Sequence, residues 1–210
     1  MGFPAFFEQA PVLRLHDGLA ELLGAPSDGV IEYRYADAVR LAGHSCPTVA
    51  GAWLCARAGL RALYGEALPE RGHVAVSLPE TEDAGVSGVI GQVLTLVTGA
   101  AGAGGFKGLA GHHVRAGLLR YGEAGIDALR LRRRDSGQVV EVTLDTSPVP
   151  VEPDQRNLFA LVVHGQAEAA QQRRLADAWQ ARVRRLLLEH ADDPAVVQVR
   201  CIAPATALRS

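Results

Sequence analysis

The sequence GHSCPTVAGAWL, residues 43–54, marks the point where a loop turns into a long central helix. Pro47 suits the first helical position, because its missing N–H would have no partner inside a helix and its fixed φ is already helical. No further proline follows before about Tyr64, so the helix is expected to continue to that point. Cys46 is therefore expected at or near the N-cap, where unpaired N–H groups and the helix dipole favour a thiolate.

The predicted central helix is unusually rich in small residues. Each glycine inside a helix costs about 1 kcal/mol relative to alanine, so two of them in one helix indicate a closely packed neighbour. The small residues are Ala50, Gly51, Ala52, Ala56, Ala58 and Gly59.

Helix and strand patterns follow one another irregularly on both sides of this helix. Before it, apolar spacing and turn residues predict a helix over Pro11–Leu23, a strand over Val30–Tyr35 and a short helix over Asp37–Ala42. After it, the patterns predict a strand over Gly72–Ser77, a buried helix over Gly85–Thr98, a hairpin of Ala128–Arg133 with Gln138–Leu144, a helix over Glu168–His190 and a strand over Val196–Ile202.

This irregular order favours an α+β fold over a doubly wound sheet, which needs a regular alternation of strand and helix. We expect one core domain over residues 1–150, in which a mixed or antiparallel sheet packs on helices. Residues 151–210 are expected to form a C-terminal helical extension packed on that core.

Composition excludes several classes of function. The chain of 210 residues is 48% hydrophobic with a formal net charge of −2, which gives no general attraction to nucleic acid or to an anionic membrane. No apolar run approaches the roughly 20 residues that span a bilayer, and the N-terminal residues do not resemble a signal peptide. Three cysteines, at positions 46, 55 and 201, suggest a reducing compartment without disulfides. A cytoplasmic protein without membrane or nucleic-acid partners is expected.

Two conspicuous stretches do not match the functions that they suggest at first sight. The glycine-rich segment 99–111 contains neither of the two standard phosphate-loop spacings, and it follows a helix rather than a strand. The basic stretches Arg130–Arg134 and Arg182–Arg185 fall on a predicted strand and on the polar face of a predicted helix. Solvated faces are the expected interpretation of both, since no aromatic stacking platform accompanies them.

The motif Gly43-His44-Ser45-Cys46-Pro47, followed by the small-residue helix, resembles the signature of the FmdE family, which is named for the formylmethanofuran dehydrogenase operon. A second block, in which a helix ends at Leu96-Val97-Thr98-Gly99 before a glycine-rich loop with Lys107, is also similar to that family. The resemblance covers roughly residues 30–145. It implies an α+β core, an intertwined homodimer and a metal site near the histidine and cysteine of the motif.

The chain also departs from the family pattern. Some members carry a C-terminal zinc finger, whereas no CxxC pair occurs here and Cys201 stands alone. The family often has a further cysteine near the start of the second helix, but residues 83–90 contain none. Functions that need paired thiols are therefore not implied.

Spacing alone leaves His44 and Cys46 open to a purely structural interpretation as a helix cap with a half-buried imidazole. With the resemblance, we expect both to bind zinc or another divalent transition metal such as Fe²⁺ or Ni²⁺. Four-coordinate zinc needs further donors, and His112 and His113 beyond the glycine-rich segment are the leading candidates. As neighbours on an extended segment they would point to opposite faces, so one of them at most is expected to reach the metal.

Two other functions use the same motif. Cys46 would serve as a nucleophile or redox thiol with His44 as its base, or the Cys-Pro pair with its neighbouring histidine would bind haem. The motif does not identify a reaction. A small-molecule ligand is expected, but the sequence does not define a substrate.

Overall fold

The computed structural model describes residues 2–202. Its elements, in chain order, are the 3₁₀ helix η1 (Ala5–Gln9), β1 (Leu13–His16), α1 (Gly18–Leu22), β2 (Val30–Tyr33), α2 (Tyr35–Ala42), α3 (Pro47–Tyr64), β3 (Val74–Ser77), α4 (Ser87–Thr98), β4 (Leu119–Arg120), β5 (Leu129–Arg133), β6 (Val139–Leu144), α5 (Gln155–Val163), α6 (Ala169–Leu188) and β7 (Val197–Ile202). None of the helices in this part of the chain is both long and apolar enough to cross a membrane.

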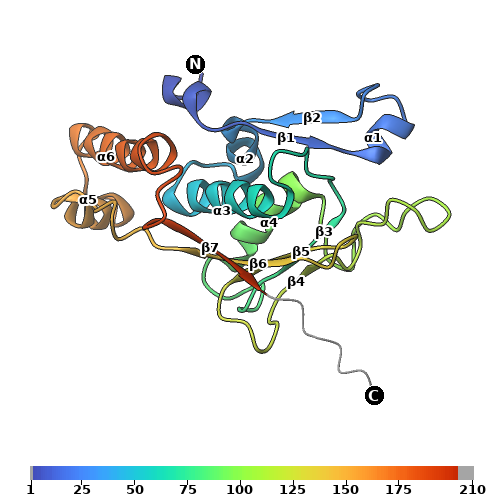
Figure 1. Cartoon of the computed structure of the whole chain (residues 1–210). Helices are drawn as coiled ribbons and strands as arrows, with labels where there is room; N and C mark the ends of the chain where they lie inside the picture. Colours follow the sequence, from blue (N-terminus) through green and yellow to red (C-terminus); the bar gives the residue numbers. More distant parts are fainter. Residues whose placement is uncertain (1, 203–210) are drawn as a thin grey trace.

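The strands form a mixed sheet and a separate ribbon, which confirms the α+β prediction. Five strands pair in the order β4-β3-β5-β6-β7, and every pair is antiparallel except β3 with β4. Strands β1 and β2 form an antiparallel ribbon. Figure 1 shows helices α2, α3 and α4 between this ribbon and the five-stranded sheet, with α5 and α6 beside one end of α3.

Helix α3 lies at the centre of the core and runs from Pro47 to Tyr64, as predicted. The two glycines of α3 allow close packing on the sheet. A Cβ atom added to Gly51 would overlap the Leu144 side chain, and one added to Gly59 would overlap Leu131. The close neighbour expected from the small residues is therefore the sheet itself.

The predicted helix over Pro11–Leu23 is wrong. The residues form strand β1, and helix α1 begins only at Gly18. Leu13 and Leu15 alternate with exposed neighbours and turn into the core, which is the two-residue period of a strand. The Asp17 carboxylate then accepts from the N–H groups of Leu19 and Ala20, so it starts the short helix.

Residues 151–202 contribute helices α5 and α6 and also strand β7, which pairs along the whole of β6. The end of the described chain is thus part of the main sheet. The proposed division into a core over 1–150 and an extension over 151–210 remains a prediction, and residues 203–210 lie outside the described part.

Candidate functional site

The turn between α2 and α3 places Cys46 at the N-cap of α3. Gly43 ends α2 with a φ of +75°, a left-handed conformation that favours glycine. Cys46 then has extended backbone angles, and its Sγ accepts from the Val49 N–H at 3.5 Å. Pro47 follows at the start of the helix. The predicted cap is confirmed, and the Cys46 side chain is only 8% exposed.

Neighbouring helices hold this turn from two sides. The hydroxyls of Tyr35 in α2 and Ser45 lie 3.0 Å apart. The Gln180 amide of α6 donates to the Ser45 carbonyl at 3.1 Å. Burial raises the pKa of Tyr35, so its hydroxyl stays neutral. The segment that carries Cys46 is therefore fixed by side chains 10 and 135 residues away from Ser45.

His44 is exposed, and its ring is oriented by the backbone. Its Nδ1 lies 3.0 Å from the Ala42 carbonyl oxygen. A carbonyl only accepts, so Nδ1 carries the proton and donates. In the neutral ring Nε2 then keeps a free lone pair, which is the tautomer that a metal-binding histidine needs.

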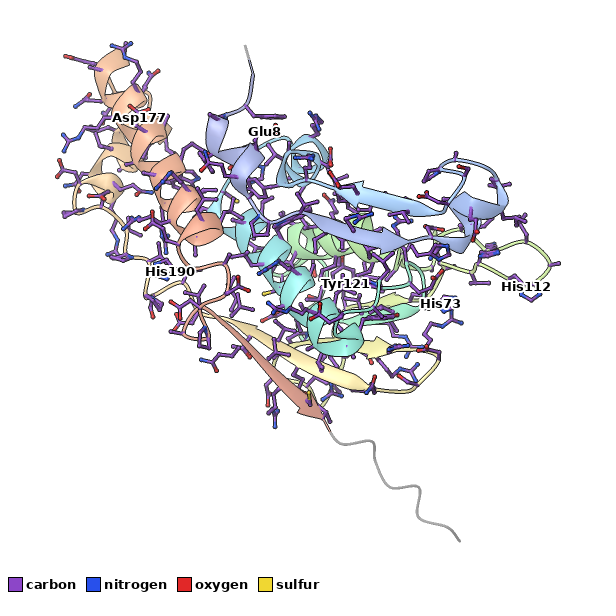
Figure 2. The ribbon with its side chains drawn as sticks, turned by 45° about the horizontal axis from the view of Figure 1, so that its top comes forward. Glu8, His73, His112, Tyr121, Asp177 and His190 are labelled. Atoms are coloured by element: carbon purple, nitrogen blue, oxygen red, sulfur yellow. The ribbon has the colours of Figure 1, made fainter. Side chains whose placement is uncertain are left out.

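His112 and His113 directly follow the glycine-rich segment, away from the turn that carries Cys46. His112 is exposed, and Figure 2 shows it at the outer end of its loop. The His113 ring lies next to the start of α1, where its Cε1 is 3.3 Å from the position of a Cβ on Gly18. In Figure 1, this loop projects at the opposite end of the molecule from the start of α3.

The four predicted ligands are therefore not assembled into one site. Among residues 2–202, no three or more His, Cys, Asp and Glu side chains form a group that could hold a metal ion. The turn between α2 and α3 provides two donors, His44 and Cys46, and the described residues place no third His, Cys, Asp or Glu with them. Cys55, the other cysteine of α3, belongs to the core, and burial raises its pKa to about 12.

Sequence reasoning missed a second polar cluster, centred on the buried Asp17. Its carboxylate accepts from Arg71 at 2.9 Å and from Arg115 at 2.7 Å. Arg71 also donates to the Leu96 carbonyl near the end of α4. The available signal was the alternation of Leu13, Leu15 and Asp17, because residues two apart share one face of a strand.

This cluster ties three distant segments together. Burial alone would raise the pKa of Asp17, but the hydrogen bond from Arg71 and the charge of Arg115 hold it below its ordinary value. The carboxylate is thus ionised inside the protein and fully paired. The arrangement joins the residue after β1, the segment before β3 and the segment before β4, which is a structural role.

His16 adds a pH-dependent pair beside this cluster. The hydrogen bond with Glu70, 2.6 Å away, raises the pKa of His16 above 6.5, and Glu21 adds to the effect while burial opposes it. A raised pKa in the folded state means stability that is present below pH 6.5 and lost as the pH rises through the folded value. We expect wild type to lose up to about 1 kcal/mol over this rise, because the pair is partly exposed. Urea unfolding of wild type and His16→Gln across this range should show the loss in wild type only, and parallel curves would contradict it.

Comparison with known proteins adds one structural likeness. No family model matches the sequence, and no curated protein matches it. Among solved structures, the chain is similar to a tungsten formylmethanofuran dehydrogenase FmdE-like protein from Syntrophus aciditrophicus. The identity is 16% and the TM-score 0.46, over 83% of this chain and 74% of the other. At this level the family resemblance of the motif remains a prediction.

Proposed function

We propose that the protein binds a divalent transition metal ion, zinc in the first instance, through Cys46 and His44 at the turn between α2 and α3. One observation carries the proposal. His44 lies two residues before Cys46, the N-cap of α3, and its Nδ1–H donates to the Ala42 carbonyl. Histidines that bind metals usually donate their second N–H to such an acceptor. The thiolate of a cysteine is the form that binds metals, and the Cys46 sulfur already accepts from the Val49 N–H at the start of α3.

The coordination would be completed from outside the protomer. Zinc in proteins is usually four-coordinate, and the turn supplies two donors. A homodimer, which the motif's resemblance to the FmdE family implies, would bring the donors of a second chain, with His112 or His113 as its proposed ligand. A bound small molecule is the other source of donors.

Elemental analysis of the purified protein tests this assignment. Wild type should carry metal in a stoichiometric amount, while Cys46→Ser and His44→Ala should bind it at least about 100-fold more weakly, since loss of an outer-shell partner alone costs 10- to 100-fold. Serine keeps an oxygen that can cap α3, so Cys46→Ser separates loss of the ligand from loss of the cap. Cys201→Ala, which removes the exposed thiol of β7, is the matched control and should keep its metal.

The variants also decide between the proposal and its structural alternative. If wild type contains no metal after growth and dialysis in zinc, the turn is a helix cap only. If both variants of the turn keep the same metal content as wild type, the metal lies elsewhere. His112→Ala and His113→Ala then test the proposed second-chain ligands, because loss of metal in one of them supports their contribution.

A further inference from the structure

A cleft lies on the side of the five-stranded sheet that faces away from α3. Alternation along β5 turns Leu129 and Leu131 into the core and places Arg130 and Arg132 on the other side. Ser77 lies opposite Arg130 in the neighbouring strand, and Ala75 lies opposite Arg132. Residues from segment 117–126, which includes the edge strand β4, complete the lining of a space of about 420 Å³.

The lining of this cleft is strongly basic. Four arginines, Arg120, Arg130, Arg132 and Arg134, line the cleft with one acidic residue, Glu123, and Arg130 is also paired with Glu141 beside it. Within residues 2–202, the side chains of Arg120 and Arg132 form no ion pair, and the Arg134 guanidinium donates only to the Gly72 carbonyl. The stretch that we expected to be a plain solvated strand face therefore lines a cleft with unneutralised charge.

Arg130, a further arginine of the lining, is only partly satisfied. One of its terminal nitrogens donates to Glu141 at 2.6 Å, and Glu141 is also bound by Arg200. The Nε of Arg130 is buried and has no hydrogen-bond partner in the described part of the chain. A buried donor without an acceptor is destabilising, so the Arg130 side chain is held at a cost in the wall of the cleft.

The rest of the lining suits the organic part of a ligand. Leu118, Ile126 and Val139 add apolar surface beside the arginines. The volume falls in the range of small-molecule sites, which combine apolar walls with a few charged groups. Among the described residues, no aromatic side chain lines the cleft, so this part of the chain gives it no stacking surface of the kind on which single-stranded nucleic acids bind.

We propose that this cleft binds a small organic molecule that carries a phosphate group. The planar guanidinium forms paired hydrogen bonds with phosphate oxygens, and several arginines converge here without enough carboxylates. The site is separate from the proposed metal site, because α3 and the sheet lie between the turn at Cys46 and this side of β5.

Calorimetric titration with inorganic pyrophosphate tests the proposal. The test variant Arg120→Gln/Arg132→Gln removes two charges that hold no ion pair in the described chain, so its fold should be unaffected. We expect wild type to bind pyrophosphate and this variant to bind it at least about tenfold more weakly, since one hydrogen bond to a charged group accounts for that factor. The matched control is Arg14→Gln/Arg173→Gln, which removes the same charge from exposed positions outside the cleft and should bind like wild type.

The remaining measurements separate this site from its alternatives. Cys46→Ser should bind pyrophosphate like wild type, because the anion does not use the proposed metal. The proposal fails if wild type does not bind pyrophosphate, if the cleft variant binds it unchanged, or if the control loses as much affinity as the cleft variant. It also fails if a single-stranded RNA oligonucleotide binds more tightly than pyrophosphate and depends on the same two arginines, because the surface would then serve nucleic acid.

Discussion

Replacing Asp17 by alanine is expected to lower the free energy of unfolding by about 3–5 kcal/mol. The carboxylate is nearly inaccessible to solvent, and its removal leaves the Arg115 guanidinium, which is 8% exposed, without its partner. A buried charge without a partner is among the most costly defects in a folded protein. The same change removes the cap of α1.

Urea unfolding followed by circular dichroism measures this loss. Asp177→Ala is the matched control, because Asp177 lies on the exposed side of α6 and has no hydrogen bond or ion pair among the described residues (Figure 2). It should change the unfolding free energy by less than about 0.5 kcal/mol. A loss below about 1 kcal/mol for Asp17→Ala would show that the three segments do not depend on this carboxylate.

Local signals were sufficient for much of the fold. The proline at the start of α3 and the turn Asp135-Ser136-Gly137 between β5 and β6 act within a few residues, and both elements were predicted where they lie. Strand β1 was not, because its pattern of leucines also fits a helix. The strand is stabilised by its pairing with β2 and by the contacts of Asp17 with arginines 54 and 98 residues away. Contacts between such distant residues produce no periodic pattern in the local sequence.

In the candidate site, too, features set by neighbouring residues could be predicted and features set by distant contacts could not. The position of Cys46 at a helix N-terminus follows from Pro47, its immediate neighbour, so it could be predicted. The place of His112 and His113 depends on how the glycine-rich segment 99–111 and the turn after it cross the molecule, and that turn contains His113 with a φ of +56°. Nothing within a few residues of the histidines determines which part of the molecule that loop approaches.

Trp53 should be the most important apolar side chain of α3, and Trp53→Ala is expected to cost about 3–5 kcal/mol of unfolding free energy. Its side chain is fully buried, and its ring lies edge-on to Tyr35 with centroids 6.3 Å apart. Its Nε1–H donates to the Pro11 carbonyl at 3.0 Å. Alanine would leave a large cavity and remove both contacts.

The Trp53 substitution also reaches the candidate site, because Tyr35 contacts Ser45 next to Cys46. We therefore expect Trp53→Ala to make Cys46 react faster with a thiol reagent, measured in a Cys55→Ala/Cys201→Ala background so that Cys46 is the only cysteine. Trp53→Phe keeps an aromatic ring against Tyr35 but not the hydrogen bond, so its loss of stability should be smaller and its Cys46 reactivity near that of wild type. Equal Cys46 reactivity in wild type and Trp53→Ala would contradict this expectation. The α2–α3 turn would then be held by Gln180 and by the hydrogen bond between the Cys46 Sγ and the Val49 N–H, without the aromatic core. The metal site would in that case tolerate changes in α3.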